Sequence, residues 1–369
     1  MSTVPVRNRR ELRGILETNL VRGPEPEVGE NIIEEPTEET MKLTKSQILE
    51  SNLPFENYVA RHERPFTFSR TEDSTLWNVI SNNSIVGYLD ISNPRLWILH
   101  SIGYAKEMKS LVYEMTAGDG SMIDFPWFAS DSLDHIGHFG ETGAGFSLKY
   151  RNEFVKSGQD SDVEDMTMRF WGAAALELID QLRRSERIKA GLSLSGIGLS
   201  HKIENGYVKE QVSSDGRITA IKGDSIDSHF SIISKIQHYY QTLLNRIENE
   251  YRFSYEKKPH GVAFKGEALE IRFERRIVDL ISFAESMFST FLPFRLWGVI
   301  KSLGEDSVKV KAVDLHTGGR IDFEIGPDQM MLYLQEHACA NVITRLFANL
   351  QSSYDAQSKL LGQADDRII

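Results

Sequence analysis

The clearest pattern in the chain is a repeat of apolar residues at steps of three and four over residues 224–251. The repeating positions are Ile226, Phe230, Ile233, Ile236, Tyr240, Leu243, Ile247 and Tyr251. This spacing places them along one side of a helix, which Asp224 or Ser225 can cap. Because a lone helix of this length is only marginally stable, the pattern predicts a core helix that covers a sheet. A two-chain coiled-coil contact is the alternative.

Upstream of this helix, β-branched and aromatic runs predict a mixed sheet in an N-terminal unit over residues 41–155. The predicted strands are 75–80, 85–91, 96–100, 123–128 and 146–150, with helices at 104–115 and 130–139. Residues 44–51 begin with Thr-Lys-Ser-Gln, which is a modest helix-capping signal. We therefore expect a short helix over residues 44–51.

A second unit is predicted over residues 166–274, after a polar linker. Its predicted order is a strand, a helix at 173–187, several strands, the long helix and further strands. Two helices that cover one face of an antiparallel sheet in this order are typical of a split β-α-β, or ferredoxin-like, unit.

The remaining ordered residues, 275–350, predict a helix at 277–291 followed by three strands, which suggests a small β-rich, barrel-like unit. The predicted fold class is therefore α+β. Residues 1–40 are highly charged and are interrupted by proline, and residues 351–369 are mostly polar. We expect the first segment to be a disordered tail and the second to be frayed.

Charge and cysteine content narrow the class of protein. The net charge of −11 argues against broad adhesion to nucleic acid or to anionic membranes, although it leaves room for a local basic groove. A single cysteine, Cys339, excludes an intrachain disulfide and a cysteine-rich zinc module. With neither a signal-peptide pattern nor an apolar run near the roughly 18 residues of a membrane span, the sequence predicts a soluble, cytoplasmic protein.

Histidines and carboxylates form one candidate metal site. His135 and His138 are three residues apart, so a helix would present both on one face, where they could reach a metal ion. Asp134 is a further candidate ligand, and His100 ends a predicted strand. These four residues define the site of a metal-assisted hydrolase; histidines with a surface or packing role are the alternative. No glycine-rich loop has the strand-to-helix context of a phosphate cradle, so no cofactor is identified.

Basic and aromatic residues interleave over residues 252–276. The members of this set are Lys257, Lys258, Lys265, Arg272, Arg275, Arg276, Tyr255 and Phe264. Aromatic rings can stack on bases while cations contact phosphates, so the region is a candidate site for single-stranded nucleic acid. A solvated strand face is the alternative.

A further aromatic group surrounds Pro293 and consists of Phe291, Phe294 and Trp297. It predicts either a core between domains or a protein-binding patch. No stretch combines a nucleophile, a base and a stabilising group. The leading hypothesis is therefore a non-catalytic binding or scaffold subunit of an intracellular assembly, with a protein partner or self-association. Nucleic-acid binding and metal-assisted hydrolysis are the two alternatives.

Overall fold

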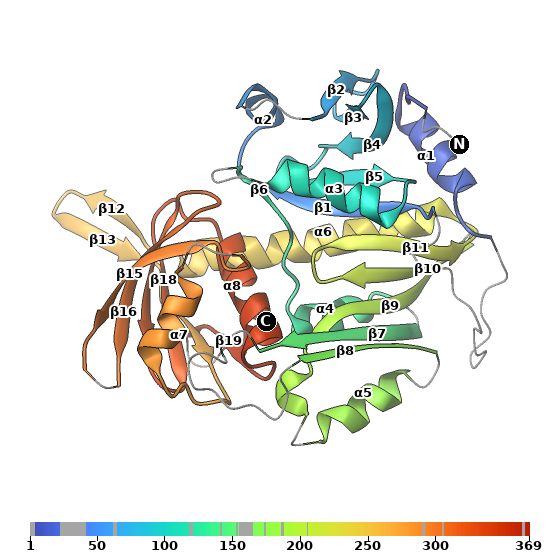
Figure 1. Ribbon diagram of the computed structural model, residues 1–369. Helices are drawn as coiled ribbons and strands as arrows, with labels where there is room; N and C mark the ends of the chain where they lie inside the picture. The colour runs from blue at the N-terminus through green and yellow to red at the C-terminus, as the bar shows by residue number, and fades with distance from the viewer. Residues whose placement is uncertain are drawn as a thin grey trace.

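The computed structural model describes residues 4–22, 42–61, 65–117, 121–140, 142–152, 154, 165–172, 175–185, 188–204, 206–289, 292–304, 306–363 and 366–369. Over these residues the fold is α+β and contains two extended antiparallel sheets (Figure 1). The α+β class predicted from the sequence is confirmed.

The large sheet has the strand order β2-β3-β4-β5-β1-β11-β10-β9-β7-β8, and β6 pairs with β1 at one side. Its strands are β1 (Lys45–Ser51), β2 (Thr67–Arg70), β3 (Leu76–Ser81), β4 (Ser84–Asp90), β5 (Leu96–Ser101), β6 (Ile123–Asp124), β7 (Thr142–Arg151), β8 (Asp165–Trp171), β9 (Leu194–Ile203), β10 (Gly206–Ser213) and β11 (Arg217–Gly223).

The C-terminal sheet has the order β15-β16-β17-β18-β14-β19, and β12 pairs with β13 in a separate hairpin. These strands are β12 (Ser254–Lys258), β13 (Gly261–Lys265), β14 (Leu269–Arg272), β15 (Leu296–Ser302), β16 (Val308–Asp314), β17 (Arg320–Ile325), β18 (Gln329–Leu334) and β19 (Lys359–Leu361). The helices are α1 (Arg9–Thr18), α2 (Phe55–Arg61), α3 (Ala105–Thr116), α4 (Ser130–Gly137), α5 (Ala175–Arg183), α6 (Ile226–Arg246), α7 (Leu280–Met287) and α8 (Asn341–Ser353).

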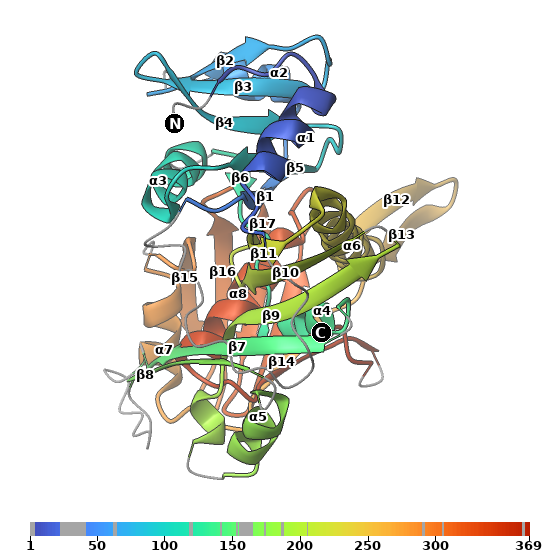
Figure 2. The same cartoon turned by 90° about the vertical axis from the view of Figure 1, so that its right-hand side faces the viewer.

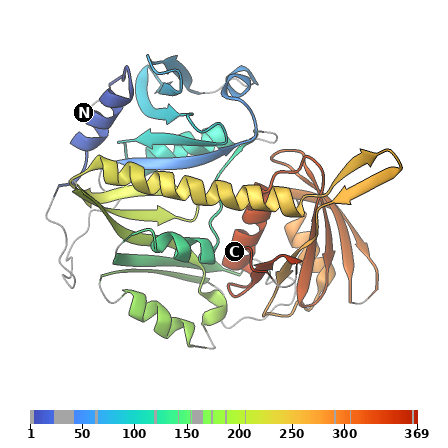
Figure 3. The same cartoon turned by 180° about the vertical axis from the view of Figure 1, so that it is seen from behind.

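The long helix α6 crosses the large sheet and is seen most clearly from behind (Figure 3). It begins at Ile226 and runs on through a wider turn at Ile247–Tyr251. The predicted apolar stripe is buried, with Phe230 only partly so. The prediction of a core helix over a sheet is therefore confirmed.

The large sheet is covered on both faces near its centre. On β5, Leu96 and Ile98 belong to the core beneath α6, whereas Trp97 and Leu99 belong to the core beneath α3. Figures 1 and 3 show α3 and α6 on opposite sides of these strands. Because successive side chains of a strand point to opposite faces, a strand covered on both sides is apolar at every position.

The helix α8 lies between the two sheets (Figure 1) and is buried along most of its length. The face of the C-terminal sheet turned toward it is apolar, as Val308, Val310 and Ala312 show on β16. The alternate residues Lys309 and Lys311 point outward and are exposed. The outer face of the C-terminal sheet is thus free of any covering layer in the described part of the chain.

The helix expected over residues 44–51 is wrong, because this segment forms β1 in the middle of the large sheet. Its lysine, glutamine and glutamate favour a helix in isolation. Pairing with β5 and β11 overrides that preference, since the strand completes the backbone hydrogen bonds of both neighbours.

Both predicted tails contain ordered elements. In the first, α1 packs Leu12 and Leu16 against β4 and α6, beside which it lies in Figure 2. In the last, β19 pairs with β14, and Ile368 and Ile369 are buried. A few apolar residues in polar segments are enough to anchor each end. Residues 23–41 lie outside the described residues.

The finer division of the fold is not confirmed. Strands from the predicted N-terminal and central units share the large sheet, and none of the sheets formed by the described residues closes into a barrel. The expected ferredoxin-like and barrel-like units therefore remain predictions. The predicted linker at 156–165 lies outside the described residues except for Asp165, which begins β8.

Candidate functional site

Four buried polar residues form a chain between the large sheet and α6, which we call the buried histidine chain. Ser46 on β1 places its Oγ 2.8 Å from His100 Nδ1 and 2.8 Å from His229 Nε2. His229 Nδ1 in turn contacts a carboxylate oxygen of Glu210 on β10. All four side chains are essentially inaccessible to solvent.

Glu210, His229 and Ser46 follow the order of acid, base and nucleophile in a hydrolytic triad. However, the hydroxyl proton of Ser46 can serve only one of its two imidazole neighbours, and the oxygen accepts from the other. Since Ser46 is 0% exposed, no substrate can reach its oxygen in this conformation. We therefore interpret the chain as a set of buried hydrogen bonds that ties α6 to β1, β5 and β10, although Glu210 Oε2 has no hydrogen-bond partner among the described residues.

Burial controls the protonation of this chain. It lowers the pKa of His100 to about 3 and raises the pKa of the Glu210 carboxyl above its ordinary value, since both charged forms lose their water. His100 is therefore neutral at pH 7, which suits a ring that exchanges hydrogen bonds with a neutral hydroxyl.

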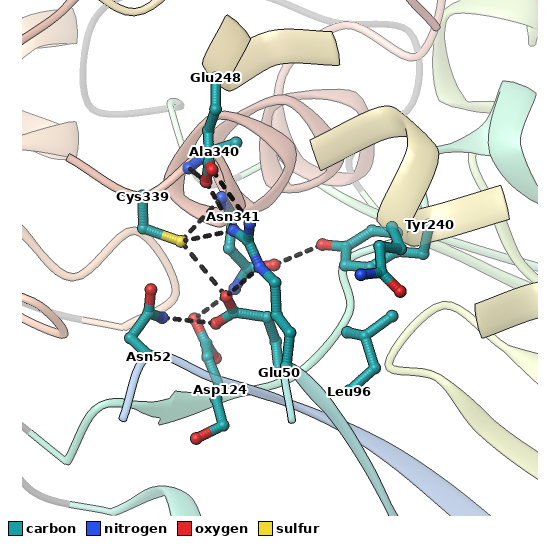
Figure 4. Close-up of polar contacts among 12 residues, drawn as sticks. Glu50, Asn52, Leu96, Asp124, Tyr240, Glu248, Cys339, Ala340 and Asn341 are labelled. Atoms are coloured by element: carbon teal, nitrogen blue, oxygen red, sulfur yellow. Dashed lines mark hydrogen bonds and ion pairs between the residues drawn. The ribbon is translucent and has the colours of Figure 1, made fainter. Parts of the chain in front are cut away.

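A second polar cluster joins the two sheets, and Figure 4 shows the part of it around Glu50, Asp124 and Asn341. This buried junction consists of Glu50, Arg95, Asp124, Glu248, Asp314, Cys339, Asn341 and Arg345. Its members come from β1, β6, β16, the ends of α6 and β5, and the start of α8. It therefore lies where the elements of both sheets meet.

Glu50 and Arg95 form one half of the junction. Arg95 donates to both Glu248 oxygens, at 3.0 and 2.5 Å, and its Nε lies 3.3 Å from Glu50 Oε1. Glu50 also accepts from Asn52 Nδ2 at 2.7 Å and from Cys339 Sγ at 3.4 Å. Burial nevertheless raises the pKa of the Glu50 carboxyl to about 7, against the attraction of Arg95. Burial likewise raises the pKa of the Cys339 thiol.

Arg345 forms the other half. Its guanidinium donates to Asp124 at 2.5 Å, to Asp314, and to the carbonyl of Phe294 at 3.1 Å. Burial opposes its charge, but the two carboxylates raise the pKa of Arg345 above its ordinary value. A fully buried arginine with two carboxylates is charged and costs several kcal/mol to leave unpaired. The junction thus holds β6, β16 and α8 in one arrangement.

The exposed candidate is the β12–β13 hairpin, which we call the arm. It projects from the body of the molecule (Figures 1 and 3). Tyr255 and Phe264 are direct cross-strand partners, and Lys257 pairs with Val262 on the same face. Tyr255, Val262 and Phe264 are 57%, 51% and 80% exposed. The arm thus presents apolar side chains to solvent.

The aromatic face of the arm borders a hollow of about 850 Å³, which we call the arm groove. Tyr255 and Phe264 line one side, and Lys311 and Arg320 on the outer face of the C-terminal sheet line the other. Gln335, at the end of β18, also lines it. The arm and the sheet therefore share one concave surface.

The structure divides the predicted nucleic-acid site. Lys257, Lys258 and Lys265 lie on the arm with Tyr255 and Phe264. Three arginines do not: Arg272 pairs with Glu270 on β14, Arg275 stacks on Tyr354 at 5.1 Å, and Arg276 follows Arg275 outside the arm groove lining. Strand pleating also places Lys258 and Lys265 on the face opposite Tyr255.

The predicted metal ligands have other partners. His100 belongs to the buried histidine chain, and His135 stacks on Tyr239 with ring centroids 4.8 Å apart. His138 Nδ1 contacts the Asp134 backbone carbonyl, and the Asp134 carboxylate lies 3.4 Å from Arg183. Within the described residues, no three His, Cys, Asp or Glu side chains converge in a way that could hold a metal ion. The metal site remains a prediction.

The predicted aromatic interface is also divided. Phe294 is buried and packs on Phe154, whereas Trp297 is half exposed on β15, an edge strand. Phe291 lies outside the described residues. The choice between a core and a binding patch therefore differs from residue to residue.

Sequence reasoning missed the polar residues that the fold buries. They are Ser46, Glu50, Glu210, His229 and Arg345. The available signal was a lone polar residue within an apolar run, as at Arg345 within Val-Ile-Thr-Arg-Leu-Phe. Their partners are distant in the sequence, so pairing could not be predicted from spacing.

Fold and sites together define an α+β protein whose converging titratable groups are buried and whose projecting hairpin carries two exposed aromatic rings, Tyr255 and Phe264. The chain belongs to the family of MJECL33-like proteins, whose sequence model matches residues 1–369. It is 24% identical over 400 aligned residues to the uncharacterized protein MJECL33 of Methanocaldococcus jannaschii. The alignment covers 97% of this chain and 95% of that relative.

No solved structure matches the chain. Of the helices that the described residues form, none combines the length and apolar character needed to cross a lipid bilayer.

Proposed function

We propose that this protein is a non-catalytic binding subunit that holds a macromolecular partner in the arm groove. The observation that carries the proposal is the exposure of Tyr255, Val262 and Phe264 on one face of a two-stranded hairpin. A hairpin of two strands is marginally stable in water, and exposed apolar patches mark interaction surfaces. A partner that covers these rings would stabilise both the arm and the complex.

The buried polar groups support a binding role over a catalytic one. The side chains of the buried histidine chain are inaccessible to solvent, and in the buried junction only Arg95 and Glu248 are partly exposed. Within each cluster most polar groups contact other members of the same cluster. Each therefore fits the task of orienting elements, whereas the arm groove is a concave surface on which exposed rings lie beside cations.

Site-specific photo-crosslinking tests this proposal. A benzophenone amino acid replaces Phe264 in the full chain, expressed in the cells that normally make it. The matched control replaces Ala263, which lies one residue away on the opposite face of the same strand. We expect discrete adducts from position 264 that position 263 does not give, because only position 264 faces the groove.

Equal adducts from both positions, or none from position 264 in a chain with unchanged thermal stability, would contradict the proposal. The first result would mean random collision, and the second would mean that nothing binds at the arm groove.

A further inference from the structure

We infer that the partner held in the arm groove is single-stranded nucleic acid, an inference that rests on the proposed function. The first observation is the shape of the surface. A neighbouring hollow of about 380 Å³ shares Phe253, Lys311, Asp322 and Gln335 with the arm groove. The two hollows thus form an elongated depression along the outer face of β16–β18, which suits an extended chain better than a compact ligand.

The second observation is the set of aromatic rings along this depression. Tyr255 and Phe264 line it on the arm, and Phe253 and Tyr333 line it near the sheet, with their ring centroids 6.0 Å apart. Rings that border a groove in this way offer flat faces to successive bases, and such stacking tolerates any base sequence.

The third observation is the local charge. The whole chain carries a net charge of −11, yet the outward side chains of β15–β17 include four cations, Lys301, Lys309, Lys311 and Arg320, against three carboxylates on this surface, Asp322 and Glu324 on the same strands and Glu336 in the lining of the arm groove. Glu324 is already paired with Lys309 at 3.4 Å. In the described part of the chain, Lys311 and Arg320 have no carboxylate within ion-pair distance.

Lys257 adds a further cation on the aromatic face of the arm. A polyanion is therefore attracted to this face of an acidic protein. An acidic polypeptide would satisfy the cations but not the row of rings. Alternating negative charge and flat bases, as in a single strand, satisfies both.

Fluorescence anisotropy with the full chain tests the inference. The probes are labelled oligothymidylate and oligouridylate of about 16 nucleotides, a length that spans one small binding surface. We expect both to bind, a duplex of equal length to bind more weakly, and polyglutamate to compete poorly. The relative affinities of oligothymidylate and oligouridylate show whether the arm groove prefers DNA or RNA.

Variants locate the binding. Phe264→Ala removes a stacking ring and is expected to weaken binding roughly 5- to 150-fold. Lys257→Ala should lower the slope of log Kd against log salt concentration by roughly 0.7, the value for one phosphate contact with a single strand. The matched control is Lys258→Ala on the opposite face, which should change neither quantity.

Three results would each overturn the inference. The first is that neither probe binds at about 50 mM salt, where phosphate contacts are strong. The second is that polyglutamate displaces the probe as well as unlabelled oligonucleotide does, and the third is that Lys257→Ala and Lys258→Ala change binding equally. Adducts at position 264 that contain protein but no nucleic acid would leave the proposed function standing while this inference fails. Absence of both adducts and oligonucleotide binding would remove both.

Discussion

Glu50 and Arg345 are both fully buried, yet burial affects the charge of each side chain differently. Arg345 contacts two carboxylates and a backbone carbonyl, so it keeps its charge. Glu50 has one guanidinium that it shares with Glu248, and Asp124 lies near enough to disfavour a second negative charge. Its carboxyl therefore titrates at a pKa of about 7, in the physiological range.

The raised pKa of Glu50 predicts a pH dependence of stability. The folded protein binds the Glu50 proton more tightly than the unfolded chain, whose pKa is near 4.5. The tighter proton binding adds to the free energy of unfolding, and this addition is fully present below pH 4.5 and is lost as pH rises through 7. It amounts to about 3 kcal/mol at most. We expect Glu50→Gln to remove this loss, measured as the free energy of unfolding by urea between about pH 4 and 8, a range that contains both pKa values.

The exposed Glu56→Gln is the matched control and should leave the pH profile unchanged. Acid destabilisation should also persist in both variants. Burial lowers the pKa of His100 to about 3 and of His316 to about 4, so the unfolded chain binds protons at these residues more tightly than the folded protein does. Their contribution to the free energy of unfolding is therefore present above pH 6.5 and is lost as pH falls. The difference in free energy of unfolding between the wild type and Glu50→Gln isolates the Glu50 contribution, and a difference that stays constant as pH rises from 4.5 through 7 would show that Glu50 does not titrate in this range.

At the scale of elements, α1 shows how little apolar surface is needed to hold a segment. The helix is polar on average, but Leu12 and Leu16 are buried against α6 and β4. Glu17 also accepts a hydrogen bond from the backbone N–H of Ile226 at the start of α6. The helix therefore caps α6 while it covers the edge of its core.

Leu16→Ala tests whether α1 belongs to the folded core. Leu16 is 0% exposed, so its truncation should lower the free energy of unfolding by about 2 to 5 kcal/mol. Arg10→Ala, on the exposed side of the same helix, should change it by less than about 0.5 kcal/mol. Chemical denaturation of both variants gives the comparison. Equal, small effects would mean that α1 contributes nothing to the stability of the fold.

Prediction from the sequence succeeded where one element carries its own pattern. The stripe from Ile226 to Tyr251 specifies a buried helix whatever it packs on. It failed for β1, where the polar residues Ser46 and Glu50 are buried by partners about 50 to 290 positions away. Local periodicity carries no information on such pairings, and Arg345 was overlooked for the same reason.

For the candidate site, the sequence indicated the basic and aromatic residues of the arm but not their arrangement. Tyr255, Lys257 and Phe264 share a face because of the hairpin register, which also turns Lys258 away. Lys311 and Arg320 join them only through the tertiary fold. The arginines that follow the arm, such as Arg275, were drawn into packing instead.

At the scale of the whole molecule, polar groups are used in two ways. The buried junction and α8 unite the large sheet and the C-terminal sheet, because Arg345 contacts both Asp124 and Asp314. No described part of the chain covers the outer face of the C-terminal sheet or the arm. The central claim is that the exposed rings of the arm are kept for a partner and contribute little to the fold.

The most direct test is the free energy of unfolding of the Tyr255→Ser/Phe264→Ser double variant of the full chain. Both rings are more than half exposed and belong to residues that lie directly opposite each other across the hairpin. We predict a change below about 1 kcal/mol, the scale of one cross-strand pair. A loss of about 2 kcal/mol or more, as buried rings give, would contradict the account.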